Sequence, residues 1–151
     1  MPRVIHIEST FELPFRRQDL WPILRKTDWI NRSVGLPSVQ FDILPLVEGG
    51  SEVVARAKLS GLQLRWREMP FEWVEPEFYR VHRIFLSGPL AEGRMGMDFS
   101  ELGADRTHIR VYNDLTARNA VGAWFARYLL GPKINRSMRQ IMEHVTQHLR
   151  G

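Results

Sequence analysis

Residues 92–115 read EGRMGMDFSELGADRTHIRVYNDL, and this stretch decides the fold. In each half, apolar residues alternate with polar ones, as in a β-strand that buries one face. Gly103 and Ala104 stand between the halves and mark a turn too short to hold a helix. The stretch therefore predicts an antiparallel hairpin with both apolar sets on one side. Those sets are Met95, Met97 and Phe99 with Gly93, and Ile109, Val111 and Leu115 with Asn113.

Similar strands extend upstream, so that residues 38–117 predict six consecutive antiparallel strands. A further strand is predicted over residues 4–13, which are rich in β-branched side chains. The expected sheet is antiparallel, curved and seven-stranded. The turns between its later strands are expected at Glu48-Gly49-Gly50, Ser60-Gly61, Glu75-Pro76, Gly88-Pro89 and Gly103-Ala104.

Helical spacing of apolar residues appears in two other places. Residues 119–150 predict a long amphipathic helix, which Gly131-Pro132 should kink or briefly break. Between residues 15 and 35, Asp19 is expected to cap one short helix and Asp28 a second. The second would hold Trp29 and Ile30. The element order is thus β-α-α-β6-α.

This order resembles that of the START, birch-pollen-allergen and polyketide-cyclase superfamily, also called SRPBCC, over essentially the whole chain. Two local stretches are similar as well. Leu20-Trp21-Pro22-Ile23-Leu24 followed by Asp28 looks like the apolar helix of that family. The run from Trp66 to Trp73, with Arg83 and Gly88-Pro89-Leu90 downstream, is similar to a branch fused to bacterial nucleotide cyclases.

The resemblance implies an α+β helix-grip fold over residues 1–151 as a single domain, with an internal cavity between the sheet and the C-terminal helix. Members of the superfamily hold lipids, steroids, quinones, plant hormones or polyketide intermediates there. A fold of this kind leaves the chemistry open.

Matching the apolar faces of neighbouring strands predicts one polar row across the inner face of the sheet. Glu68 is expected opposite Arg83, Arg83 opposite Met95, and Met95 opposite Asn113. An arginine on an apolar face needs a partner, because burying an unpaired charge costs several kcal/mol. Glu68 is the nearest acid, and a bulge is expected close to it, at Met69-Pro70.

The row has two interpretations. Its side chains could orient the polar head of an amphipathic ligand, or they could form an internal ion pair with a purely structural role. The predicted apolar neighbours are equally open to an interpretation as plain core. The candidate ligand-binding residues are Glu68, Arg83, Asn113, Trp66, Tyr79, Phe85, Met95, Met97, Phe99, Val111, Trp124, Phe125 and Tyr128.

Composition excludes several classes of site. The chain has no cysteine, which rules out disulfides, thiolate metal sites and a cysteine nucleophile. Gly93 and Gly96 lie inside a strand, where they cannot form a dinucleotide-binding turn. His144 and His148 share a helix face but have no clear third metal ligand. No cofactor and no metal are therefore predicted.

The charge of +4 is mild and mostly arginine, which favours a solvated surface over a nucleic-acid site. The early charged residues and the lack of a long apolar stretch predict neither a signal peptide nor a transmembrane segment, and a cytoplasmic location is expected. The oligomeric state is left open.

The sequence favours a non-enzymatic domain that binds or carries a small hydrophobic or amphipathic molecule, such as a lipid, quinone or polyketide-like compound. One alternative is a polyketide cyclase or dehydratase that uses the inner polar groups for proton transfer. The other is a regulatory ligand-sensing module linked to a nucleotide cyclase.

Overall fold

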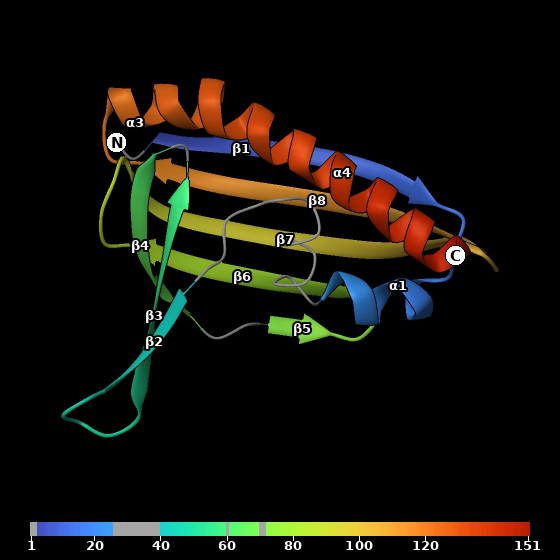
Figure 1. Ribbon diagram of the computed structural model, residues 1–151, viewed down its shortest axis with the longest axis horizontal. Helices are drawn as coiled ribbons and strands as arrows, with labels where there is room; N and C mark the ends of the chain where they lie inside the picture. Colours follow the sequence, from blue (N-terminus) through green and yellow to red (C-terminus); the bar gives the residue numbers. More distant parts are fainter. Residues whose placement is uncertain (1–2, 26–39, 60, 70–71) are drawn as a thin grey trace.

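A computed structural model of the chain describes residues 3–25, 40–59, 61–69 and 72–151. A long C-terminal helix lies across one face of an antiparallel sheet (Figure 1). The α+β helix-grip fold predicted from the sequence is confirmed. The strands are β1 (Arg3–Leu13), β2 (Gln40–Pro45), β3 (Ser51–Leu59), β4 (Leu62–Glu68), β5 (Glu72–Val74), β6 (Phe78–Phe85), β7 (Leu90–Gly103) and β8 (Arg106–Ala117).

The strands follow the order β1-β8-β7-β6-β4-β3-β2, and the short β5 also pairs with β6. Strands β4 and β5 thus lie one after the other along the same edge of β6. Between them, the Met69 N–H still donates to the His82 carbonyl at 3.0 Å. The described part of residues 38–117 therefore contains seven strands where six were expected, because one predicted strand is divided near Met69.

The C-terminal helix has three parts: α3 (Ala120–Trp124), η1 (Phe125–Leu130) and α4 (Gly131–Arg150). Asn119 caps it, since its side-chain oxygen accepts a hydrogen bond from the Gly122 N–H at 2.9 Å. The sequence predicted a kink or a brief break at Gly131-Pro132. Gly131 keeps helical angles, φ −57° and ψ −54°, so the helix does not break there, and the kink stays a prediction. Instead η1 is a π-helical turn, whose wider hydrogen-bond spacing accommodates the missing N–H of Pro132.

A short helix, α1 (Arg17–Leu24), packs on the last turns of α4 and buries Leu20, Trp21 and Leu24. The sequence predicted Asp19 as its N-cap, and this prediction is wrong. The helix begins at Arg17, and Asp19 lies in the first turn, where its carboxylate is 3.2 Å from Arg16 Nε. The predicted second helix with Asp28, Trp29 and Ile30 lies outside the described residues.

Two apolar clusters lie between the sheet and the helix. The helix-end cluster gathers α1, the middle of the sheet and the last turns of α4. Its buried members are Leu13, Leu20, Trp21, Leu24, Met97, Phe99, Ile109, Val111, Ile141, Met142 and Val145. The helix-start cluster lies under η1 and consists of Ile5, Ile7, Ala55, Leu64, Trp66, Phe85, Leu90, Leu115, Ala126 and Leu130.

Candidate functional site

Polar side chains interrupt the inner face of the sheet between the two clusters. On β8, Asn113 separates Val111 of the helix-end cluster from Leu115 of the helix-start cluster. Glu68 ends β4 beyond the last apolar residue of that strand. We call the four residues Ser9, Glu68, Arg83 and Asn113 the inner polar belt. Each lies where strand alternation would otherwise place an apolar residue.

Glu68 and Arg83 form the charged part of the belt. They pair across β4 and β6 in the predicted register, with Arg83 Nε 3.2 Å from Glu68 Oε2. The same carboxylate oxygen accepts a hydrogen bond from Trp66 Nε1 at 2.5 Å. The guanidinium carbon of Arg83 lies 5.0 Å from the centre of the Trp66 ring, within range of a cation–π contact. These contacts hold Arg83 in one orientation.

The belt also carries hydrogen-bonding capacity that the described residues do not use. Asn113 is 5% exposed, and within the described ranges its amide has no hydrogen-bond partner. The two terminal nitrogens of Arg83 likewise contact no acceptor among those residues, although 29% of the side chain is exposed. Neither group is among the fully buried, unpaired polar atoms of the described residues, so a molecule that enters from solvent could use these donors.

Tyr79 lies on the same strand as Arg83, four residues away, and packs with the helix-end cluster. Its hydroxyl donates weakly to the Leu24 carbonyl at 3.4 Å, and its ring meets Trp21 edge-on at 6.0 Å. Burial raises the pKa of Tyr79 to about 12, so the hydroxyl stays protonated at neutral pH.

One step of the predicted row is wrong. Arg83 lies opposite Gly93, and Met95 lies opposite Val81, whereas Arg83 had been expected opposite Met95. The β6–β7 turn is centred on Gly88, whose φ of +87° suits glycine, and this shifts the pairing by two residues. A shift of two keeps every side chain on its face. The remaining step is as predicted, with Met95 opposite Asn113.

The other candidate residues divide between the two clusters and the surface. The interior contains both clusters, and Phe125 packs against the helix-start cluster. Trp124 and Tyr128 are instead 54% and 59% exposed, so they lie apart from the belt. Small residues of the helix, Gly122 and Ala126, face the sheet in their place. The buried candidates are Met97, Phe99 and Val111 in the helix-end cluster and Trp66 and Phe85 in the helix-start cluster.

A hollow of about 580 Å³ opens beside Glu68. It lies at the far edge of the sheet, where β3 begins and β4 ends, and no described residue of the C-terminal helix lines it. Glu68 is the one candidate residue on its wall. The described residues that line it are Leu46, Ser51, Glu52, Val53, Arg67, Glu68 and Met69.

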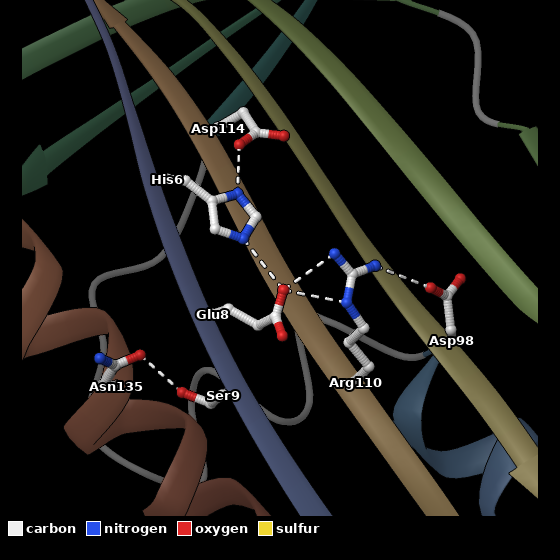
Figure 2. Close-up of polar contacts among 7 residues, drawn as sticks. All are labelled: His6, Glu8, Ser9, Asp98, Arg110, Asp114 and Asn135. Carbon is white, nitrogen blue, oxygen red and sulfur yellow. Dashed lines mark hydrogen bonds and ion pairs between the residues drawn. The ribbon is translucent and has the colours of Figure 1, made fainter.

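Sequence reasoning missed Ser9 of the belt and two polar residues of α4 near it, Asn135 and Ser137. Ser9 on β1 donates to the side-chain oxygen of Asn135 on α4 at 2.6 Å, which ties the helix to the sheet (Figure 2). Ser137, two residues further along α4, is buried at 8% exposure and has no side-chain hydrogen bond among the described residues. Ser9 could have been found, because it interrupts the inward apolar series Ile5, Ile7 and Phe11.

Charged residues cross the outer face of the sheet from β1 to β7 (Figure 2). His6 Nδ1 lies 2.5 Å from Asp114, and its Nε2 lies 3.0 Å from Glu8. Arg110 bridges Glu8 and Asp98. Its Nε donates to Glu8 Oε1 at 3.0 Å, and its Nη1 donates to Asp98 Oδ2 at 3.2 Å. The hydrogen bonds to Asp114 and Glu8 raise the pKa of His6 above 6.5.

Solved structures share this arrangement of sheet and helix. A norcoclaurine synthase from Thalictrum flavum matches with a TM-score of 0.64 at 10% identity, over 98% of this chain and 94% of the other. An aromatase/cyclase from a Streptomyces species matches with a TM-score of 0.59 at 15% identity, over 95% and 87%. A START superfamily protein from Mycobacterium smegmatis matches with a TM-score of 0.53 at 12% identity, over 95% and 93%.

The chain has the fold of the START-like proteins. The resemblance predicted from the sequence is thereby confirmed at the level of the fold. No family model matches the sequence, and no curated protein matches it. Identities this low show a shared fold and do not transfer a ligand or a reaction. In the part of the chain that the structure describes, no helix is long and apolar enough to cross a membrane.

Proposed function

We propose that this chain binds a small amphipathic molecule between sheet and helix, with the polar end of the molecule at the inner polar belt. The observation that carries the proposal is the unused hydrogen-bonding capacity of Asn113 and Arg83. A ligand with acceptor groups for each would satisfy an amide that is 5% exposed on β8 and a guanidinium on β6 that is already held by Glu68.

The apolar clusters on either side of the belt support the same proposal. A ligand with an apolar body would meet aromatic and aliphatic side chains on leaving the belt in either direction. Because Glu68 already neutralises Arg83, the site does not require a fully charged ligand. A carboxylate, a carbonyl or a phenol could accept from Arg83, and a carboxylate would bind most strongly.

The test uses dodecanoate and dodecanol as probes, with isothermal titration calorimetry on the purified chain. Replacing Arg83 by Met keeps the length of the side chain and removes its donors. We expect Arg83→Met to weaken dodecanoate binding by about tenfold or more, as for other charged hydrogen bonds. Dodecanol should be affected less.

The matched control is Arg80→Met on the same strand, whose guanidinium lies on the outer face, 4.3 Å from the centre of the Phe78 ring. This variant loses the same charge outside the proposed site and should bind like the wild type. Equal affinity of the Arg83→Met protein and the wild type would refute the proposal and leave the Glu68–Arg83 pair a structural feature. Native mass spectrometry of the freshly purified chain would reveal a ligand that copurifies. The cyclase and the nucleotide-cyclase alternatives stay predictions.

A further inference from the structure

The outer side of the C-terminal helix carries an exposed apolar stripe that the proposed function does not use. Four large side chains of α3 and η1 each leave half or more of their surface in solvent. They are Val121 at 72%, Trp124 at 54%, Tyr128 at 59% and Leu129 at 50%. The rings of Trp124 and Tyr128 lie 6.2 Å apart, so they form one continuous aromatic surface.

The stripe has a structural cause. Gly122 and Ala126 take the positions that face the sheet, and an added Cβ on Gly122 would lie 2.2 Å from the Pro89 carbonyl oxygen. The helix start therefore packs through small residues. Its large apolar side chains are left outside, where no packing of the fold accounts for them.

Positive charge is concentrated in the C-terminal segment that contains the stripe. The whole chain carries a net charge of +4, yet residues 118–151 hold six basic side chains and the single carboxylate of Glu143. The rest of the chain is thus close to neutral. The six are Arg118, Arg127, Lys133, Arg136, Arg139 and Arg150.

Three of these cations differ from those on the outer face of the sheet. Several outer-face arginines pair with carboxylates, such as Arg110 with Glu8 and Arg94 with Glu92. Arg127, Arg136 and Arg139 are exposed, and no carboxylate among the described residues pairs with them. Their charge is therefore available to an external partner.

We propose that this outer helix face docks on the surface of a membrane that contains anionic lipids. Trp and Tyr side chains favour the boundary between acyl chains and headgroups, and nearby arginines are attracted to negative headgroups. The apolar stripe would enter the interface, with the arginines of α4 lying along it. A second copy of the chain fits this face less well, because a two-fold interface would bring the arginines of both copies together.

This inference goes beyond the proposed function and does not depend on it, since the stripe lies outside the belt. The two are compatible. A domain that docks in this way could exchange an amphipathic molecule with the bilayer.

The test is cosedimentation of the full chain with vesicles. We expect binding to vesicles of phosphatidylcholine and phosphatidylglycerol in equal parts, weaker binding to phosphatidylcholine alone, and loss of binding as salt rises. Trp124→Ala should weaken binding by about tenfold, because it removes the largest interfacial side chain. Its matched control is Trp73→Ala on β5, a tryptophan that is 63% exposed elsewhere on the surface and should bind normally.

A second pair of double variants tests the position of the charge, because each of them loses two positive charges. Arg136→Gln with Arg139→Gln should weaken binding to the anionic vesicles, whereas Arg65→Gln with Arg80→Gln on the sheet should not. Three results would overturn the proposal. The first is no binding to anionic vesicles at low salt, and the second is equal binding of the Trp124→Ala and wild-type proteins. The third is a dimer in sedimentation velocity that Trp124→Ala dissociates, because the stripe would then be a contact between two copies.

Discussion

At the residue scale, the chain places charge on both faces of its sheet, with different consequences. Glu68 on the inner face is 9% exposed and accepts from two donors, Trp66 and Arg83. Glu52 on the outer face is 21% exposed, and it pairs with Arg67, whose side chain is 44% exposed. The free-energy cost of removing either acid depends on how well water can replace it.

Glu68→Ala should lower the free energy of unfolding by about 2–4 kcal/mol, because it leaves a mostly buried guanidinium and a buried indole N–H without an acceptor. Glu52→Ala should cost less than about 1 kcal/mol, as is usual for exposed pairs. Urea unfolding of both variants measures the difference. Equal costs would show that the inner pair is as well solvated as the outer one.

The pH dependence of stability should report on His6. Because the folded pKa of His6 is raised, mainly by Asp114, the charged imidazole stabilises the fold fully below pH 6.5. That contribution is lost as the pH rises through the raised pKa. The difference in stability between wild type and His6→Gln should thus be largest in acid and shrink toward alkaline pH, as followed by urea unfolding at several pH values.

The control for His6 is His108→Gln on β8. His108 has no ion pair among the described residues, so its variant controls for the loss of an imidazole that makes no such contact. A His6 effect that does not vary with pH would contradict the assignment of the stabilising role to the imidazolium.

At the element scale, the start of the C-terminal helix is fixed to the β6–β7 turn by close backbone contact. The Arg118 N–H donates to the Pro89 carbonyl at 3.0 Å, and Arg118 Nη2 donates to the Phe85 carbonyl at 2.7 Å. Gly122 then passes directly over that turn. This contact orients the helix across the sheet more rigidly than side-chain packing alone would.

Gly122→Ala should therefore destabilise the fold by about 1–3 kcal/mol, although alanine favours helix more than glycine does. The added methyl would meet a backbone carbonyl at 2.2 Å, which cannot move without the turn. Gly131→Ala is the control, since its methyl would lie 3.2 Å from the nearest atom and should cost less. Thermal unfolding of both proteins gives the comparison. A Gly122→Ala protein as stable as the wild type would mean that the β6–β7 turn moves to make room for the methyl group at no cost in stability.

At the scale of the whole molecule, burial is uneven across the sheet. Strands β1, β7 and β8 carry both clusters on their inner faces, and β8 alternates between buried and half-buried residues along most of its length. Every residue of β2 is exposed, and the β2–β3 hairpin projects away from the helix (Figure 1). The centre and this edge of the sheet should differ in local stability.

Amide hydrogen exchange should show this difference. We expect the β2 amides to exchange much faster than those of β8, because opening an exposed edge strand exposes little apolar surface. The β3 amides that pair with β4 serve as an internal reference of intermediate protection. Equal protection of β2 and β8 would indicate that the sheet opens only as a unit.

The sequence alone was enough to predict most of the strands, the long helix and the face that each strand buries. Alternation defines which side of a strand is apolar, and it correctly placed Tyr79, Val81, Arg83 and Phe85 on one side of β6. It also supplied the Glu68–Arg83 and Met95–Asn113 pairs, because few registers keep all the faces matched.

Only the tertiary structure decided how these faces meet. Arg83 pairs with Gly93, two residues from the predicted Met95. Registers that differ by two residues keep every side chain on its face, so alternation cannot distinguish them, and the turn at Gly88 selects one. The tertiary structure also showed that Trp124 and Tyr128 point outward. Apart from Arg127, the helix start carries mostly apolar side chains. The close approach of the Pro89 backbone leaves room only for Gly122 on the side facing the sheet, so the largest side chains were left in solvent.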